Sequence, residues 1–267
     1  MPSIFRERLL ADRVAFVTGG GSGIGLRIAE RFAQHGCAVV LAGRKPEKLD
    51  AAAAAIRAVG GSAATEPLDV RDYDAVAAAL DRSRRRFGEI DIILCAAAGN
   101  FPAPAAAMSA NGFKAVVDID LLGTFNTCRA AYPHLRKPGA SVLAISANHA
   151  VMPFALQSHV CAAKAGVELL VKTLALEWGP SGVRANCITP GATADTEGMS
   201  RLAPTEDARR AIESSLPLGR FGTKDELADL ALFLSSDAAG YITGAVFVCD
   251  GGAALGSPGF TAALQAT

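Results

Sequence analysis

A glycine-rich segment at residues 17–25, with the sequence VTGGGSGIG, constrains the fold of this chain more than any other feature. The apolar run 14–17 before it has the length and composition of a buried strand, and apolar residues then recur at helical spacing from Ile24 to Ala33. A glycine turn between a strand and a helix lets the backbone approach a phosphate, and the first helical turn offers free N–H groups to an anion. The segment therefore predicts a site for the pyrophosphate of a dinucleotide, although glycine turns also serve packing alone.

Strand-like and helix-like patterns alternate along the whole chain, with no repeat, linker or break in composition. This alternation predicts a parallel sheet covered by helices, and 267 residues suffice for one such domain with a sizeable core. We therefore expect an α/β fold, a single-domain Rossmann-type doubly wound parallel sheet with helices on both faces. The domain takes up residues 1–267, with a core at 9–252 and a tail at 253–267 that is mobile or docks on a neighbour.

The periodicities also predict the individual elements. We expect strands at 14–17, 38–42, before 68, 90–95, 141–146, 184–188 and 246–249. We expect helices after the glycine segment, at 45–59, before Phe87, from Ser109 through 113–135, at 159–178, at 205–216 as a lid, and after Thr223, where the spacing of a capping box occurs.

Composition argues against several classes of protein. The formal net charge is zero, which favours neither nucleic acid nor an anionic membrane as a partner. No apolar run approaches the roughly 20 residues that span a bilayer, and we read neither a signal peptide nor a peroxisomal address at the ends. Six cysteines lie scattered without a C-x-x-C pair, which suits single thiols in a reducing compartment better than disulfides or a metal site. We expect a cytoplasmic protein with no resident metal.

The end of the second predicted strand bears on the kind of dinucleotide. An acid there would accept a hydrogen bond from the ribose 2′-hydroxyl, whereas an arginine pairs with a 2′-phosphate. The sequence holds Arg44 and no acid, so NADPH is favoured over NADH, the alternative being a solvated loop arginine. Asp69, at the end of the third strand, either receives the adenine amino group or caps the next helix, a part that Asp72 could equally take.

More candidate binding residues follow the fourth predicted strand. The small residues Ala98 and Gly99 let the chain pass close under a nicotinamide ribose, and Asn100 and Phe101 then point into the crevice at the carboxyl ends of the strands. In the helix that follows, Asp120 stands two residues after Asp118 and so faces another direction.

Taken in order, these motifs resemble the short-chain dehydrogenase/reductase family over residues 9–252. They are Thr18-Gly19, Gly23-Ile24-Gly25, Asp69-Val70, Ala98-Gly99, Lys164, Pro190-Gly191 and Asp250-Gly251-Gly252. The resemblance implies a single-domain NAD(P)H-dependent oxidoreductase that is often a homotetramer.

The chain departs from that family at the catalytic positions. The usual set is an asparagine, a serine and a Tyr-x-x-x-Lys pair, of which Lys164 alone matches. Val160 stands at the tyrosine position, Ala147 at the serine position and Asp120 at the asparagine position. A carbonyl reductase needs a phenol of lowered pKa to protonate an alkoxide, and valine has no proton to give. We therefore expect the ordinary alcohol and ketone chemistry to be absent.

One subgroup resembles this altered pattern, the 2,4-dienoyl-CoA reductases of the peroxisomal type. The similar stretches are 97–101, 118–126, 156–164 and 196–198. The resemblance implies that NADPH gives a hydride to the δ carbon of a dienoyl thioester and that the dienolate is protonated at the α carbon. The product is a 3-enoyl thioester, in an auxiliary step of the β-oxidation of unsaturated fatty acids. Because that proton goes to carbon, a tyrosine placed for an alkoxide is not required.

The same resemblance assigns roles to residues. We hypothesise that Asp120, assisted by Asp250, holds the water that delivers the proton, and that Lys164 binds the nicotinamide ribose and lends positive charge. The residues expected to bind the dinucleotide are Gly19, Gly21, Ser22, Gly23, Ile24, Gly25, Arg44, Asp69, Val70, Ala98, Gly99, Lys164, Pro190, Gly191 and Thr196. Those expected to contact acyl-CoA are Arg71, Asn100, Phe101, Ser109, Asn111 and Arg201, whose arginines suit its phosphates.

For several of these residues, a purely structural role or a place on the solvated surface stays open as an alternative. Phe101 could belong to the core, and Arg71 and Arg201 to the solvated surface. His159, next to the missing tyrosine, could be a general acid or a structural residue, and His149 is a weaker candidate. The whole chain could instead reduce another enoyl or oxoacyl thioester, or be a catalytically silent NADP(H)-binding sensor or subunit.

Overall fold

The computed structural model describes residues 5–255, without the side chains of Glu197, Arg201 and Leu202. In this part of the chain, seven parallel strands form one sheet in the order β3-β2-β1-β4-β5-β6-β7. The strands are β1 (Val14–Thr18), β2 (Ala38–Gly43), β3 (Ser62–Pro67), β4 (Ile92–Cys95), β5 (Ser141–Ile145), β6 (Arg184–Pro190) and β7 (Val246–Cys249). The predicted doubly wound parallel sheet is confirmed; of the predicted tail, residues 256–267 lie outside the described part.

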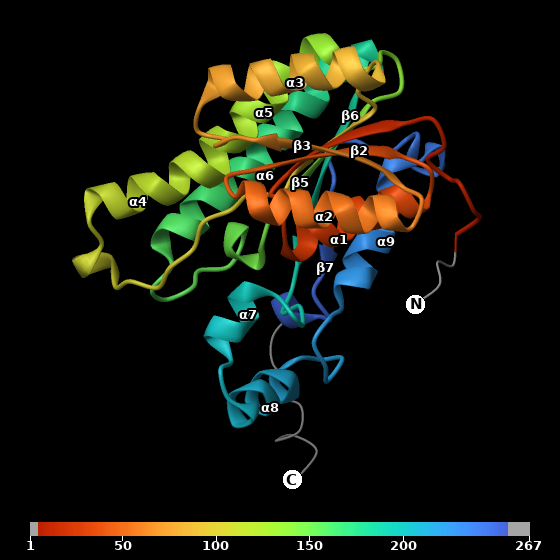
Figure 1. The fold of residues 1–267 in the computed structure, drawn as a ribbon. Helices are drawn as coiled ribbons and strands as arrows, with labels where there is room; N and C mark the ends of the chain where they lie inside the picture. The colour runs from red at the N-terminus through yellow and green to blue at the C-terminus, as the bar shows by residue number, and fades with distance from the viewer. Residues whose placement is uncertain (1–4, 256–267) are drawn as a thin grey trace.

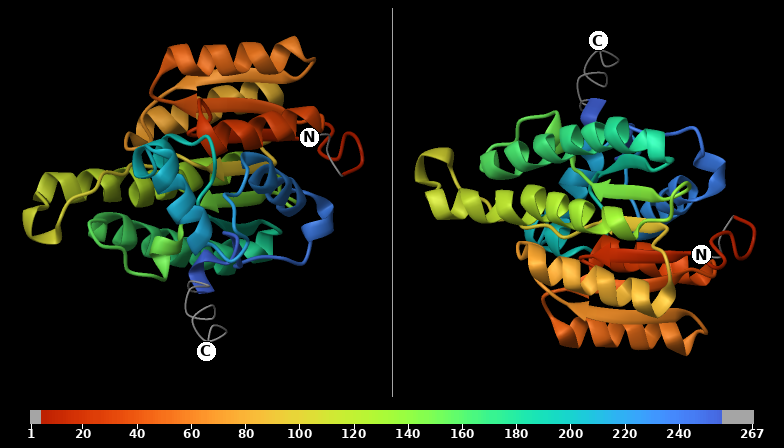
Figure 2. Two further views of the ribbon diagram at one scale, coloured as in Figure 1. Left: turned by 90° about the horizontal axis from the view of Figure 1, so that it is seen from below. Right: turned by 90° about the horizontal axis from the view of Figure 1, so that it is seen from above.

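Helices cover both faces of this sheet (Figure 1). One face carries α1, α2 and α9, and the other carries α3, α5 and α6. The view from above in Figure 2 shows α4 continuing the line of α5 outward, beyond the ends of the strands. The helices are α1 (Gly23–Gln34), α2 (Pro46–Ala58), α3 (Tyr73–Phe87), α4 (Ala110–Val117), α5 (Gly123–Ala131), α6 (Ser158–Trp178), α7 (Glu197–Leu202), α8 (Glu206–Ser215) and α9 (Lys224–Ser235).

The sheet separates two apolar cores. Along β1, Phe16 belongs to the core under α3, α5 and α6, whereas Ala15 and Val17 belong to the core under α1, α2 and α9. All five residues of β1 are buried. Because helices cover both faces of this parallel strand, its sequence is a continuous apolar run and does not alternate between apolar and polar residues.

The position of the crevice follows from the strand order. The neighbours of β1 are β2 on one side and β4 on the other. The chain after β1 enters α1 on one face, and the chain after β4 goes on to α5 on the opposite face. The two connections diverge, which leaves room for a ligand at the carboxyl ends of these strands.

The helix predicted over 113–135 is interrupted. Between α4 and α5, residues Asp118–Leu122 form a π-helical turn. Such a turn takes in one extra residue and is common at functional sites. It turns Asp120 inward, whereas Asp118 stays at the surface and pairs with Lys114. The helix expected at 205–216 is confirmed as α8, and α7 before it was not predicted; Figure 1 shows both standing clear of the sheet.

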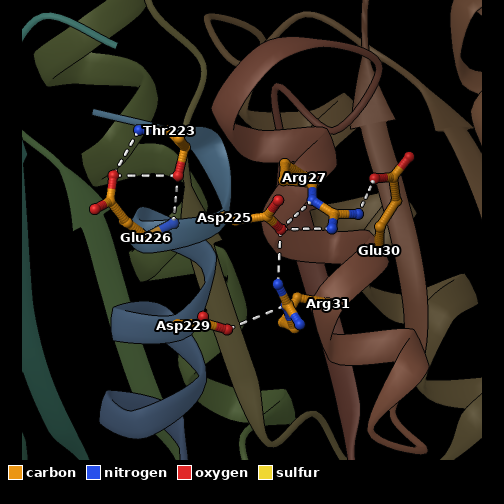
Figure 3. Close-up of polar contacts among 7 residues, drawn as sticks. All are labelled: Arg27, Glu30, Arg31, Thr223, Asp225, Glu226 and Asp229. Atoms are coloured by element: carbon orange, nitrogen blue, oxygen red, sulfur yellow. Dashed lines mark hydrogen bonds and ion pairs between the residues drawn. The ribbon is translucent and has the colours of Figure 1, made fainter. Parts of the chain in front are cut away.

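A cluster of charged side chains joins α1 to α9 (Figure 3). One carboxylate oxygen of Asp225 accepts hydrogen bonds from Arg27, at 2.8 and 2.5 Å, and from Arg31, at 2.7 Å. The Arg31 side chain is only 1% exposed, so its charge depends on Asp225 and on Asp229, 3.2 Å away. A reciprocal capping box between Thr223 and Glu226 begins α9. The cluster thus fixes the helix that follows the glycine segment.

Candidate active site

The glycine segment forms a turn that other residues could not form. Gly19 has a φ of 68°, and a Cβ on it would lie 2.6 Å from the carbonyl oxygen of Ala96. A Cβ on Gly25, in the first turn of α1, would lie 2.7 Å from the carbonyl oxygen of Gly19. The absence of side chains at these two positions brings the end of β1, the start of α1 and the end of β4 together.

A cavity of about 530 Å³ lies over this turn. The N-cap residue of α1, Ser22, makes no side-chain capping bond, and the first turn of the helix holds no acidic residue. The N–H groups there are therefore available to an anion, as a dinucleotide pyrophosphate requires. Of the residues predicted to bind the dinucleotide, those that line the cavity are Gly19, Gly21, Ser22, Gly23, Ile24, Gly25, Arg44, Asp69, Val70, Ala98 and Thr196.

Part of the cavity lining is cationic. Arg44, Lys45 and Lys48 belong to it, and all three are exposed. Asp69 also lines the cavity, and hydrogen bonds from the Arg71 side chain, at 3.0 and 2.6 Å, hold its pKa below the ordinary value. The residues present thus fit a dinucleotide that carries an additional phosphate on the adenosine ribose.

A buried ion pair lies at the carboxyl ends of β4 and β5. Asp120 is 1% exposed, and its Oδ2 is 3.1 Å from Nζ of Lys164 on α6. The other carboxylate oxygen accepts a hydrogen bond of 2.7 Å from the backbone N–H of Gly99. Lys164 also donates to the carbonyl oxygen of Ile145, at 2.9 Å. Asp120 thereby connects the π-helical turn to α6 and to the segment after β4.

The tyrosine and serine positions of the family are apolar here. Val160 is buried in a small cluster with Val116 and Ala163, against which Val117 packs. Ser146, next to Ala147, turns its hydroxyl away and donates to Glu168 on α6, at 2.7 Å.

Asp250 organises the segment after β7. Its carboxylate accepts hydrogen bonds from Asn148 Nδ2 at 3.0 Å and from the backbone N–H groups of Gly252 and Ala254, both at 2.8 Å. A Cβ on Gly191 would lie 2.5 Å from the Cα of Asp250, so the end of β6 packs directly on it. Among the described residues, no hydrogen bond or ion pair joins Asp250 to Asp120 or Lys164, and its assisting role stays a prediction.

Two of the residues predicted to contact the substrate, Phe101 and Ser109, lie at the start of α4. The Phe101 ring packs against the buried His159 ring, with centroids 4.6 Å apart, and lies over Gly112 in the first turn of α4. Ser109 is the N-cap of α4 and accepts from the N–H of Gly112 at 3.0 Å.

The other predicted contacts are placed as follows. Asn100 donates to Gln157 at 3.1 Å, and Asn111 is exposed on α4. Arg71 lies with Asp69 at the cavity, and the side chain of Arg201 is outside the described part.

Buried polar atoms without hydrogen-bond partners concentrate in the same region. They include Oδ2 of Asp120, Oδ1 of Asn148 and both ring nitrogens of His149 and His159. Burial, helped by the positive charge of Lys164, lowers the pKa of His149 despite the opposing effect of Gln157. Unpaired polar groups of this kind are the ones that a polar substrate or ordered water satisfies. Neither Asn148 nor Gln157 was predicted to be a site residue, although both flank the altered catalytic positions.

Fold and site together define a dinucleotide-binding oxidoreductase whose lysine is paired with a carboxylate. The chain belongs to the short-chain dehydrogenase/reductase family: the sequence model of the family described as enoyl-(acyl carrier protein) reductase matches residues 19–254. The chain is 45% identical to the peroxisomal 2,4-dienoyl-CoA reductases ((3E)-enoyl-CoA-producing) of Danio rerio, over 95% of this chain and 85% of that protein, and of Rattus norvegicus, over 96% and 88%. It is 40% identical to a Bacillus subtilis protein named probable 2,4-dienoyl-CoA reductase ((2E)-enoyl-CoA-producing), over 91% and 97%.

Solved structures show the same fold. A short chain dehydrogenase from Bacillus anthracis superposes with a TM-score of 0.81 at 39% identity, covering 91% of this chain and 96% of that one. A gluconate 5-dehydrogenase from Burkholderia cenocepacia, solved with NADP and tartrate, has a TM-score of 0.87 at 31% identity, covering 92% and 97%. In the described part of the chain, no helix has both the length and the apolar character needed to cross a membrane.

Proposed function

We propose that this enzyme uses NADPH to reduce 2,4-dienoyl-CoA thioesters to 3-enoyl-CoA, an auxiliary step in the oxidation of unsaturated fatty acids. One observation carries the proposal: Lys164 is held in a buried pair with Asp120, while Val160, at the phenol position of the family, lies in an apolar cluster. A site built this way keeps the charges that bind and polarise, and it has no proton donor for an alkoxide.

NADPH, when bound, supplies a hydride to the δ carbon of the dienoyl thioester. Asp120 then holds a water molecule through Oδ2, which forms the ion pair with Lys164 but accepts no hydrogen bond, and this water protonates the α carbon, which leaves the double bond between the β and γ carbons. Lys164 has one N–H beyond those directed to Ile145 and Asp120, and it donates this N–H to the nicotinamide ribose. Its charge also stabilises negative charge that develops on the substrate.

The position of the double bond in the product is part of the proposal. The vertebrate relatives are named for the (3E)-enoyl product, and the Bacillus subtilis relative for the (2E)-enoyl product. Protonation at the α carbon gives the 3-enoyl product, whereas protonation at the γ carbon gives the 2-enoyl product. The 45% identity to the (3E)-enoyl-CoA-producing relatives, against 40% to the Bacillus subtilis relative, supports protonation at the α carbon.

The choice of NADPH rests on charge. Arg44, Lys45 and Lys48 line the cavity, and the two residues directly after β2 are Arg44 and Lys45 rather than an acid. The Burkholderia cenocepacia relative was solved with NADP, which is consistent with this choice. For the acyl-CoA we propose contacts with Arg71, Asn100, Phe101, Ser109, Asn111 and Arg201, as the sequence predicts.

The test is a spectrophotometric assay of NADPH oxidation with 2,4-hexadienoyl-CoA and, separately, with acetoacetyl-CoA. Turnover of the dienoyl thioester alone, with the 3-enoyl product identified by NMR, is the expected result. Turnover of acetoacetyl-CoA would instead indicate a reductase of another thioester. NADPH binding without turnover of either would indicate the silent sensor or subunit that the loss of the tyrosine and serine also favours.

We further propose a homo-oligomer in a reducing compartment such as the cytosol. All six cysteines are free thiols, which supports that compartment. The oligomer rests on the family resemblance, with a tetramer as the expected state. Light scattering of the purified protein and fractionation of the source cells test the two statements.

A further inference from the structure

A second buried carboxylate lies beneath the ends of the strands, and the proposed mechanism does not use it. Glu168 stands one helical turn after Lys164 on α6 and is 7% exposed. Its Oε1 accepts hydrogen bonds from the hydroxyl of Ser146 at 2.7 Å and from the hydroxyl of Thr189 at 3.3 Å. Both hydroxyl residues are 2% exposed, so the whole group is shielded from water.

The two hydroxyls belong to neighbouring strands. Ser146 directly follows β5 and comes one residue after Ile145, whose carbonyl oxygen accepts the hydrogen bond from Lys164. Thr189 lies in β6, directly before Pro190. One carboxylate on α6 therefore connects the carboxyl ends of two strands to the helix that carries Lys164.

The charges in this region do not balance. Asp120 and Glu168 are two buried carboxylates, and Lys164 is the ammonium paired with the first of them. In the described part of the chain, no cationic side chain lies within ion-pair distance of Glu168. Burial, and after it the neighbouring Glu168 carboxylate, raise the pKa of the Cys187 thiol on β6 to about 12. Burying a carboxylate that only hydroxyl groups bind costs free energy of folding, which suggests that Glu168 has a function.

We propose that Glu168 is a positioning residue of the nicotinamide end of the site. It aligns the ends of β5 and β6 through Ser146 and Thr189, and its charge, added to that of Asp120, makes the site beneath the strand ends negative overall. Such a site favours a positively charged ring over a neutral one. The enzyme therefore stabilises the charge that develops on the nicotinamide as hydride departs. The inference rests on the nucleotide part of the proposed function and not on the identity of the acyl substrate.

The experiment compares the dissociation constants of NADP⁺ and NADPH in binary complexes, measured by calorimetry without any thioester. Glu168→Gln keeps the size of the side chain and an oxygen for Ser146, and it removes the charge. We expect the ratio of the NADP⁺ constant to the NADPH constant to rise on the order of tenfold, because the positively charged ring loses an attractive charge. Ser146→Ala is the matched control, since it removes one hydrogen bond and keeps the charge, so its ratio stays near that of the wild type.

Each outcome decides the question. A ratio that is unchanged in Glu168→Gln, or shifted equally in Ser146→Ala, overturns the inference and leaves Glu168 a purely structural residue. Glu168→Met, of similar length and suited to burial, supplies the same measurement if the glutamine variant does not fold. Failure of the wild-type protein to bind either nucleotide would overturn the proposed function as well, whereas binding with an unchanged ratio overturns this inference alone.

Discussion

The ammonium nitrogen of Lys164 lies 3.1 Å from Oδ2 of Asp120, although the two residues are 44 positions apart and come from different helical segments. Both side chains are buried, so each neutralises a charge that water does not reach. The second oxygen of Asp120 is held by the N–H of Gly99. An asparagine in this place could accept from Gly99, but it could not neutralise the lysine, so the acid at position 120 changes the electrostatics of the site.

The first prediction concerns that charge. We expect Asp120→Asn to lower kcat for 2,4-hexadienoyl-CoA by about 100-fold or more, because a positioned acid or base contributes at least that factor. Asp118→Asn is the control: that acid lies two residues away at the surface and pairs with Lys114, so its kcat should stay within about twofold. Steady-state NADPH oxidation measures both, and full activity in Asp120→Asn and in Lys164→Ala would remove the assigned roles.

The second prediction concerns the 2′-phosphate. Arg44 lines the cavity and makes no hydrogen bond or ion pair with other described residues. Removing a charge-assisted hydrogen bond costs roughly 1.5–3 kcal/mol, so Arg44→Ala should raise the KM for NADPH about 10- to 100-fold and leave the KM for NADH nearly unchanged. Arg85→Ala, an exposed arginine on α3 paired with Asp81, should change neither constant. Equal losses with both nucleotides would argue against a 2′-phosphate at this position.

The third prediction concerns the glycine turn. Gly19→Ala places a Cβ 2.6 Å from a backbone oxygen at a φ of 68°, which the surrounding backbone cannot relieve. We expect a loss of about 1–3 kcal/mol in the free energy of unfolding and no measurable binding of NADPH. At Gly179 a Cβ would meet nothing within 4 Å, so Gly179→Ala should leave the free energy of unfolding and the binding of NADPH nearly unchanged. Urea unfolding and nucleotide fluorescence are the two measurements, and wild-type binding by Gly19→Ala would contradict the assignment.

The glycine segment could be predicted because everything it requires is close in sequence. The strand, the turn and the first helical turn follow one another over about a dozen residues, so composition and periodicity were sufficient. The same holds for α9, whose capping box spans Thr223 to Glu226. The interruption of the long helix after Val117 could not be predicted in this way. No proline lies in the turn, and Gly123, which directly follows it, keeps helical dihedral angles. The partner against which the turn buries Asp120, Lys164, lies in another part of the chain.

Residues whose partners are distant in sequence were missed for the same reason. Asn148 donates to Asp250, 102 positions away, and Glu168 accepts from residues on two separate strands. Arg71, which the resemblance assigns to acyl-CoA, has a local partner in the structure, Asp69, two residues before it, and its contact with acyl-CoA stays a prediction. Sequence pattern indicates which residue types are present, whereas tertiary packing decides which of their atoms remain free.

The last prediction concerns the start of α9 and acid. The hydrogen bonds from Arg220 and from the backbone N–H of Thr223 lower the pKa of Glu226 to about 2, from an ordinary value of 4.5. A carboxyl whose pKa is lower in the folded state adds stability above pH 4.5, and this contribution is lost as the pH falls from 4.5 to about 2. Glu226→Gln should therefore be less stable than the wild type at pH 7, and the difference should shrink toward pH 2. Urea unfolding across this range measures it, with Glu177→Gln, an exposed acid on α6, as the control. A difference that stayed constant with pH would show that Glu226 contributes through packing and neutral hydrogen bonds alone.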